Sequence, residues 1–136
     1  MKKYLPLTGR ILFSLIFLMT VLSHFKKTTI AYAESQGVPF SDLLVPLSAI
    51  IAFLGGLSIT LGYKARIGAW LIVVFLVPVS FYMHAFWSES DPMKMQMQAA
   101  NFMKNMGLLG GALLICYFGS GPLSLDNKPE LSGRVS

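Results

Sequence analysis

The densest run of polar side chains in this chain lies between Phe81 and Gly111. Within it, His84, Gln98, Lys104 and Asn105 supply hydrogen-bond donors and acceptors that nothing nearby in the sequence obviously uses. Donors of this kind bind the carbonyl oxygens of small ligands when an apolar surface lies beside them. We therefore treat these four residues as the first candidates for a ligand-binding site.

Two further residues belong to the same candidate site. Trp87 follows His84 by three residues, and His24, the other of the two histidines, ends the first apolar segment. A structural interpretation stays open for all six residues. A histidine at a helix end is commonly an interfacial hydrogen-bonding residue, and a lysine can extend its ammonium to lipid headgroups.

Three methionines, Met93, Met95 and Met97, alternate close to His84. Thioethers are ligands for Cu(I), so an M-x-M-x-M segment beside a histidine suggests a copper site. The alternative is a short interfacial segment whose methionines enter the lipid. Without a second histidine nearby, the pattern favours the alternative, and no metal ligand is assigned.

Several classes of chemistry find no support in the sequence. It contains no P-loop, no G-x-S-x-G, no H-E-x-x-H and no paired carboxylates. None of the six acidic residues lies inside an apolar window, which removes the usual proton relay of a coupled transporter. The single cysteine, Cys116, cannot close an intramolecular disulfide. We assign no catalytic residue and no enzyme class beyond, at most, a membrane subunit of an oxidoreductase complex.

The composition is that of a membrane protein. Of the 136 residues, 54% are hydrophobic and 12% are charged, whereas a soluble domain is roughly a quarter charged. Basic residues lie in short connectors without the basic-aromatic alternation of nucleic-acid-binding proteins, so no nucleic-acid partner is expected.

Four windows are long enough to span a bilayer as helices, for which about 20 largely apolar residues are needed. They are residues 5–25, 43–61, 67–87 and 102–118. A cleaved signal peptide is the alternative for the first window, because Ala31, Tyr32 and Ala33 form a small-x-small pattern. The two lysines between the apolar core and Ala33 favour a retained helix.

Features between and within the windows predict how the helices pack. Residues 30–36 could form a short interfacial helix with Tyr32 as its anchor. Gly55 and Gly56 let a neighbouring backbone approach closely, and Gly107 with Gly111 forms a G-x-x-x-G. Pro78 removes a backbone hydrogen bond in the third window.

The basic residues predict the orientation. With the N-terminus inside, seven lie on the inner side: Lys2, Lys3, Arg10, Lys64, Arg66, Lys128 and Arg134. Four lie on the outer side: Lys26, Lys27, Lys94 and Lys104. This excess predicts that both termini are cytoplasmic. The candidate site residues, including His24, then share the outer face.

The chain resembles the DoxX family of four-helix membrane proteins over nearly its whole length. The motifs that carry the resemblance are Gly9-Arg10, Ser23 to Phe25, Gly37 to Pro39, Gly55-Gly56, Gly62 to Arg66, His84 to Trp87, Gln98, Phe102 to Asn105, Gly110-Gly111 and Gly119 to Asp126. Many members carry a glutamate where this chain has Ala52. The resemblance implies a redox-associated membrane subunit.

We therefore predict an all-α transmembrane four-helix bundle in the plasma (bacterial inner) membrane, with a DoxX-like domain at 1–126 and a polar tail at 127–136. The expected function is a redox-associated subunit whose outer pocket holds a quinone-like or other apolar ligand, bound without a covalent link. The alternative is a non-catalytic assembly factor or scaffold. Expected partners are the lipid bilayer, other membrane or redox proteins, and a second copy in a homo-oligomer. We expect His84 and Lys104 to line one cavity.

Overall fold

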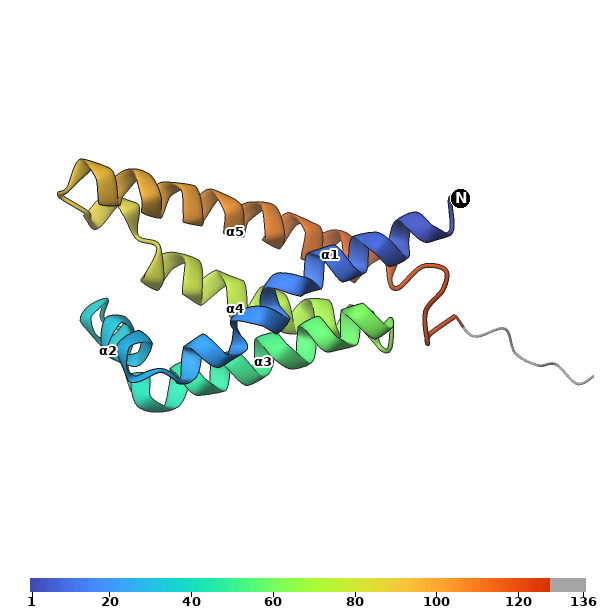
Figure 1. Ribbon diagram of the computed structural model, residues 1–136, viewed down its shortest axis with the longest axis horizontal. Coiled ribbons are helices and arrows are strands. Elements are labelled where there is room, and N and C mark those ends of the chain that lie inside the picture. Colours follow the sequence, from blue (N-terminus) through green and yellow to red (C-terminus); the bar gives the residue numbers. More distant parts are fainter. Residues whose placement is uncertain (128–136) are drawn as a thin grey trace, which may run out of the picture.

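The computed structural model describes residues 1–127, and these form helices joined by short connections, without a strand (Figure 1). The elements are α1 (Tyr4–Thr20), the 3-10 helix η1 (Val21–Phe25), α2 (Lys27–Ser35), α3 (Ser41–Leu61), α4 (Ala65–Met83), the 3-10 helix η2 (Phe86–Ser88) and α5 (Pro92–Phe118). The all-α prediction is confirmed. Residues 128–136, most of the predicted polar tail, lie outside the described part.

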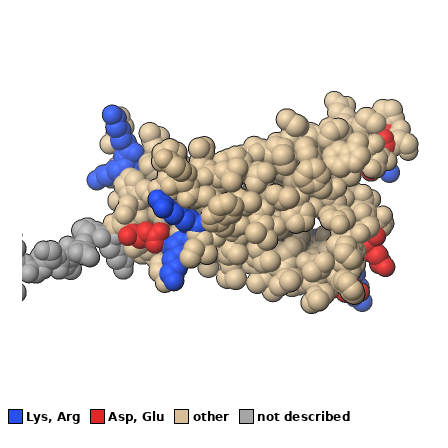
Figure 2. All heavy atoms as spheres, turned by 180° about the vertical axis from the view of Figure 1, so that it is seen from behind, with Lys and Arg blue, Asp and Glu red and all other residues tan. Residues whose placement is uncertain are grey.

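Four segments are long and apolar enough to cross a membrane: Tyr4–Phe25, Ser41–Leu61, Ala65–Ser88 and Pro92–Phe118. Figure 2 shows charged atoms at the two ends of the molecule and uncharged surface along the middle of this face. An uncharged belt between charged ends fits a bilayer-spanning bundle, because charges are costly in hydrocarbon. The four-span prediction is confirmed.

The last helix differs from its predicted bounds. It begins at Pro92, ten residues before the predicted start at 102. The Asp91 side chain accepts a hydrogen bond from the backbone N–H of Met93, and Pro92 occupies the first turn, where a helix tolerates proline. Hydropathy missed this segment because it is polar, whereas the helix start depends on capping.

The N-terminus and the end of the described chain lie at the same end of the bundle, which we call the proximal end; the other is the distal end (Figure 1). The described part of the chain, residues 1–127, therefore begins and ends on one side of the bundle. That the proximal end is cytoplasmic stays a prediction based on the basic residues.

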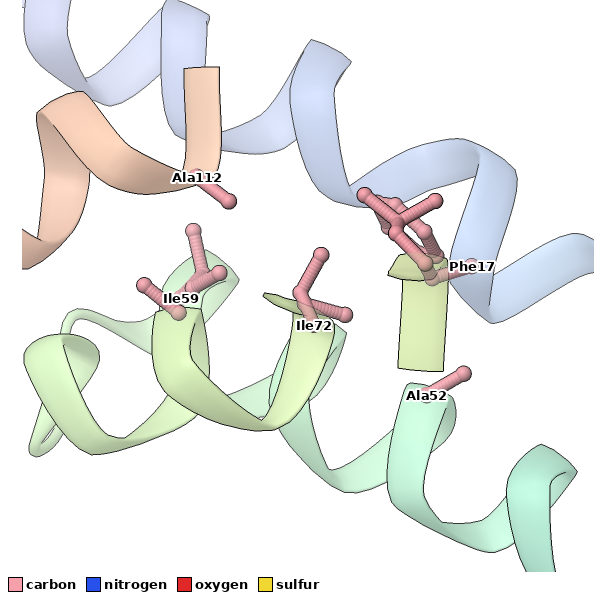
Figure 3. Packing of buried hydrophobic residues seen from close by; sticks show 7 residues of the cluster. Phe17, Ala52, Ile59, Ile72 and Ala112 are labelled. Carbon is pink, nitrogen blue, oxygen red and sulfur yellow. The ribbon is translucent and has the colours of Figure 1, made fainter. Parts of the chain in front are cut away.

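The helices pack in the order α1, α3, α4, α5. A core of mostly small and aliphatic side chains lies between them, with Ala112 of α5 directed towards Ile59 and Ile72, and Phe17 of α1 on the side of Ala52 (Figure 3). Helices α3 and α4 approach each other closely: a Cβ added at Gly55 would lie 2.8 Å from the carbonyl oxygen of Gly68. The small-residue contact predicted for the second window is therefore present.

After α5, residues 119–127 turn back across the proximal end, and we call this segment the C-terminal hook. Its backbone N–H groups at Leu125 and Asp126 donate to the carbonyl oxygens of Leu61 and Gly62, 3.2 and 2.8 Å away. Buried Arg10 of α1 donates from Nη2 to the Leu123 carbonyl oxygen at 2.6 Å. The hook thus ties α1 to the turn between α3 and α4.

Candidate functional site

The predicted site residues divide among separate places. His84 and Gln98 do come together: His84 Nδ1 lies 2.7 Å from Gln98 Oε1. An amide oxygen only accepts, so Nδ1 carries the proton. Gln98 Nε2 in turn donates to the Tyr32 hydroxyl at 3.0 Å. This chain of hydrogen bonds connects the end of α4, the start of α5 and α2.

Tyr32 belongs to this series of hydrogen bonds, but it was not among the predicted site residues. Burial, and after it the negative charge of Glu89, raises the pKa of its phenol, while the bond from Gln98 acts in the opposite direction. A neutral hydroxyl can accept from Gln98 and also lies 3.5 Å from the Met83 carbonyl oxygen. The short helix predicted at residues 30–36 is present as α2, whereas an interfacial position for Tyr32 stays a prediction and its partners were not predicted.

Trp87 lies in an aromatic cluster. Its ring centroid is 5.7 Å from Phe102 and 6.1 Å from Phe81, and its ring is about half exposed. Edge-to-face contacts at such distances stabilise packing. The cluster fastens η2 to α5 and presents an aromatic edge at the distal end.

Lys104 and Asn105 face different directions. Asn105 is 5% exposed and points into the bundle, whereas Lys104 is exposed and its Nζ lies 3.5 Å from Asn101 Oδ1 on its own helix. Adjacent helical residues point about 100° apart, so one faces the core while the next does not. The predicted shared cavity of His84 and Lys104 is therefore not formed. A ligand-binding role for these residues stays a prediction.

His24 lines a different space, a cavity of about 320 Å³ at the distal end that we call the distal cavity. It lies between α2, α3, α4 and η1, and its lining is mostly apolar, with Ile51 and Phe75 among the larger side chains. Its polar side chains are His24, Thr29, Ser48 and Tyr82. No Lys, Arg, Asp or Glu of the described residues lines it.

Helix α2 closes one side of the distal cavity through Ala33, which is fully buried. Two contacts position this helix. Tyr32 joins the chain from His84 and Gln98, and Thr29 Oγ1 donates to the Ser23 carbonyl oxygen at 2.8 Å. The predicted polar residues His84 and Gln98 therefore support the wall of a cavity that they do not themselves line.

A second cavity, of about 460 Å³, lies at the proximal end between α4 and the C-terminal hook. Lys64, Arg66 and Asp126 contribute its charged lining. The Ser120 hydroxyl, followed by the backbone N–H groups of Lys64 and Ala65, holds the pKa of the Asp126 carboxyl below its usual value. These bonds use Asp126 to cap α4, so the carboxylate has a structural role.

The three methionines considered for copper do not converge. They lie on the first turns of α5, all exposed, where Met93 and Met97 share a face and Met95 points away from it. Within residues 1–127, no group of three His, Cys, Asp or Glu side chains could hold a metal ion. The arrangement does not fit a three-thioether site.

A comparison with protein families settles what kind of membrane protein this is. The model of the SURF4 family matches residues 1–130, nearly the whole chain. The chain belongs to the SURF4 family.

Similar proteins occur in bacteria and in eukaryotes. Inner membrane protein YqjF of Escherichia coli is 33% identical over 95 residues, which are 70% of this chain and 67% of that protein. The Surfeit locus protein 4 homolog of Schizosaccharomyces pombe is 24% identical over 96% of this chain and 39% of its own length. The ER-derived vesicles protein ERV29 of Saccharomyces cerevisiae is 24% identical over 96% of this chain and 35% of its own length. No solved structure matches the chain significantly.

This SURF4-family chain spans less than half the length of its eukaryotic relatives. Two bacterial relatives, YqjF and YphA, are named as inner membrane proteins. Together with the four apolar helices, these names confirm the predicted location in the plasma (bacterial inner) membrane.

The prediction of DoxX membership is wrong, because the family model that matches is that of SURF4. Several of the residues behind that resemblance serve general needs of a helical bundle. Gly62 has a φ of +64° in the turn between α3 and α4, and Gly55 allows the close approach to Gly68. The redox and quinone expectations came with the resemblance and have no support in the SURF4 assignment.

Proposed function

We propose that this SURF4-family protein is a non-catalytic membrane binding protein that holds an apolar molecule in the distal cavity. The observation that carries the proposal is the cavity itself. Its volume of about 320 Å³ is at the lower end of the range of small-molecule sites, and few polar groups interrupt its apolar lining. An elongated apolar molecule would bury its surface there against α3 and α4.

The polar groups of the cavity support binding better than catalysis. His24 Nδ1 is 2.9 Å from the Thr20 carbonyl oxygen, and the Ser48 hydroxyl donates to the Val45 carbonyl oxygen at 2.7 Å. His24 and Ser48 are therefore each bonded to a nearby backbone carbonyl, and no bond between a hydroxyl nucleophile and a histidine base is found in the described lining. A non-catalytic role also agrees with the yeast relative's name, which refers to ER-derived vesicles and not to a reaction.

Filling the cavity tests this function. We expect Ser48→Phe to abolish saturable labelling of the lining residues by a photoactivatable dodecane in nanodiscs, because the added ring occupies the binding space. Ile50→Phe is the matched control: Ile50 is on the same helix, is 47% exposed and does not line the cavity. Mass spectrometry of the labelled peptides measures the effect. Equal saturable labelling in Ser48→Phe and Ile50→Phe would contradict the proposal.

A second candidate function, an assembly surface for another membrane protein, is favoured by one face of α5. Gly107 and Gly110 are exposed, and a Cβ added at either would meet nothing within 4 Å. Packing inside this chain therefore does not explain these two glycines, whereas a partner helix would. Gly111, the other glycine of the predicted G-x-x-x-G, lies against Phe13 of α1 and so packs inside the chain.

We expect Gly107→Leu to remove any co-purifying membrane partner, or a second copy, while the monomer stays folded. Gly9→Leu is the control, because Gly9 is an equally open glycine on α1. Native mass spectrometry of the gently solubilised protein measures the complex. A complex that survives Gly107→Leu unchanged would exclude this face as the assembly surface.

A further inference from the structure

The polar atoms of the distal cavity restrict the chemistry of what it can hold. The Thr20 carbonyl oxygen can only accept, so the ring nitrogen of His24 that faces it, Nδ1, carries a proton. In the neutral imidazole, the other nitrogen, Nε2, is then a hydrogen-bond acceptor. No partner for Nε2 is found among residues 1–127, and His24 lines the cavity.

Two of the three hydroxyl groups of the lining, those of Thr29 and Ser48, already donate hydrogen bonds to backbone carbonyl oxygens. Thr29 Oγ1 donates to the Ser23 carbonyl oxygen at 2.8 Å, and Ser48 Oγ donates to the Val45 carbonyl oxygen at 2.7 Å. Each hydroxyl has one hydrogen, so only lone pairs remain for a ligand. Both residues therefore act as acceptors towards the cavity.

Helix α4 contributes a backbone acceptor to the same region. Pro78 is inside α4 and has no N–H, so the carbonyl oxygen of Val74, four residues earlier, loses its helical donor. Val74 and Pro78 both line the cavity. A carbonyl freed in this way within a membrane-spanning helix needs another donor, because unsatisfied backbone groups are costly in hydrocarbon.

Against these acceptors, the lining offers one side-chain donor that has no partner within the described residues, the hydroxyl of Tyr82. It offers no charged side chain. A phosphate head would lack a cation, and a quinone, whose ring oxygens only accept, would leave His24 and the Val74 carbonyl without a donor. A ligand hydroxyl can donate to an acceptor and also accept from Tyr82.

We propose that the ligand of the distal cavity is an uncharged apolar alcohol, a chain or ring hydrocarbon with a hydroxyl group that donates to His24 Nε2. This inference rests on the proposed function and adds the class of ligand. The apolar body lies among the aliphatic side chains of α3 and α4, and the hydroxyl lies at the His24 side. Charged lipids, and molecules that have hydrogen-bond acceptors but no donor, bind more weakly than such an alcohol.

The test is displacement of photoactivatable dodecane from the full-length protein in nanodiscs. The competitors are 1-dodecanol and its isomer 1-methoxyundecane, which has the same atoms but no donor. We expect dodecanol to compete about fivefold more strongly, as one hydrogen bond of typical net strength predicts. In His24→Phe, which keeps an aromatic ring beside Phe75, this preference should disappear.

Pro78→Ala is the matched second variant, because it returns a backbone donor to the Val74 carbonyl. The single hydrogen of the ligand hydroxyl is assigned to His24 Nε2, so the preference for dodecanol should be unchanged in Pro78→Ala. Equal competition by the two isomers in the unmodified protein would overturn the alcohol assignment but leave apolar binding intact. Absence of saturable dodecane labelling would instead remove the proposed function itself. A preference that survives His24→Phe, or that disappears in Pro78→Ala, would overturn the assignment of His24 Nε2 as the acceptor.

Discussion

Replacing Gly55 with leucine should lower the free energy of unfolding by about 2–3 kcal/mol, since an overpacked interface forces backbones apart. A Cβ at this position would lie 2.8 Å from the Gly68 carbonyl oxygen and 3.0 Å from the Ile72 side chain. The oxygen belongs to the backbone of α4 and cannot turn aside, so α3 and α4 must separate. The gain in helix propensity on replacing glycine, under about 1 kcal/mol, offsets only part of this cost.

Unfolding by SDS in mixed micelles, followed by circular dichroism, measures this change. Gly107→Leu is the matched control, because it makes the same substitution at a helical glycine whose added Cβ meets nothing within 4 Å. We expect its stability to be unchanged or slightly higher. A similar loss in both variants would mean that the α3–α4 approach does not limit stability.

The positions of these glycines illustrate what the sequence could predict. Apolar length and small residues predicted four spanning helices and a close contact at Gly55, and both are present. Gly107 and Gly111 matched a packing motif equally well, yet Gly111 faces Phe13 and Gly107 faces no neighbour. A spacing motif shows which residues share a face, but it does not show which face the bundle covers.

Only the part of the candidate site that lies on either side of one short connection could be predicted from the sequence. His84 and Gln98 meet because a short connection returns the chain to the same depth, as expected. Lys104 could not be placed this way, because one residue of helical rotation decides whether Lys104 or Asn105 faces the core. The distal cavity depends on how α2 packs against α3 and α4. No local sequence pattern predicts that packing, because it depends on the arrangement of all the helices.

The hydrogen bonds of the C-terminal hook to the start of α4 were not predicted, since they join residues about 60 positions apart. The Asp126 carboxylate accepts from the backbone N–H groups of Lys64 at 2.7 Å and Ala65 at 3.2 Å, and from the Ser120 hydroxyl. It thereby caps α4 from a distant part of the chain. A capping side chain is normally adjacent in sequence, so nothing in residues 119–126 predicts that Asp126 caps α4.

Asp126→Ala should therefore lower the free energy of unfolding by about 2 kcal/mol at neutral pH, the upper range for loss of a helix cap. Two backbone N–H groups lose their acceptor, and the hook loses a bond that fixes it to α4. Glu34→Ala is the control, because Glu34 is an exposed carboxylate in α2 without a hydrogen bond from its side chain in the described structure. Thermal unfolding in detergent compares the two variants with the unmodified protein.

The same bonds predict how this loss depends on pH. The pKa of Asp126 in the folded protein lies below its ordinary value, chiefly because Ser120 donates to the carboxylate. A lowered pKa means that the ionised group stabilises the fold at pH values above the unfolded pKa of about 4. This stabilisation is lost as the pH falls through the lower, folded pKa.

The stability difference between the unmodified protein and Asp126→Ala should therefore be full at pH 7 and shrink below about pH 4. A difference that stayed constant down to about pH 2 would show that the carboxylate charge does not hold the hook.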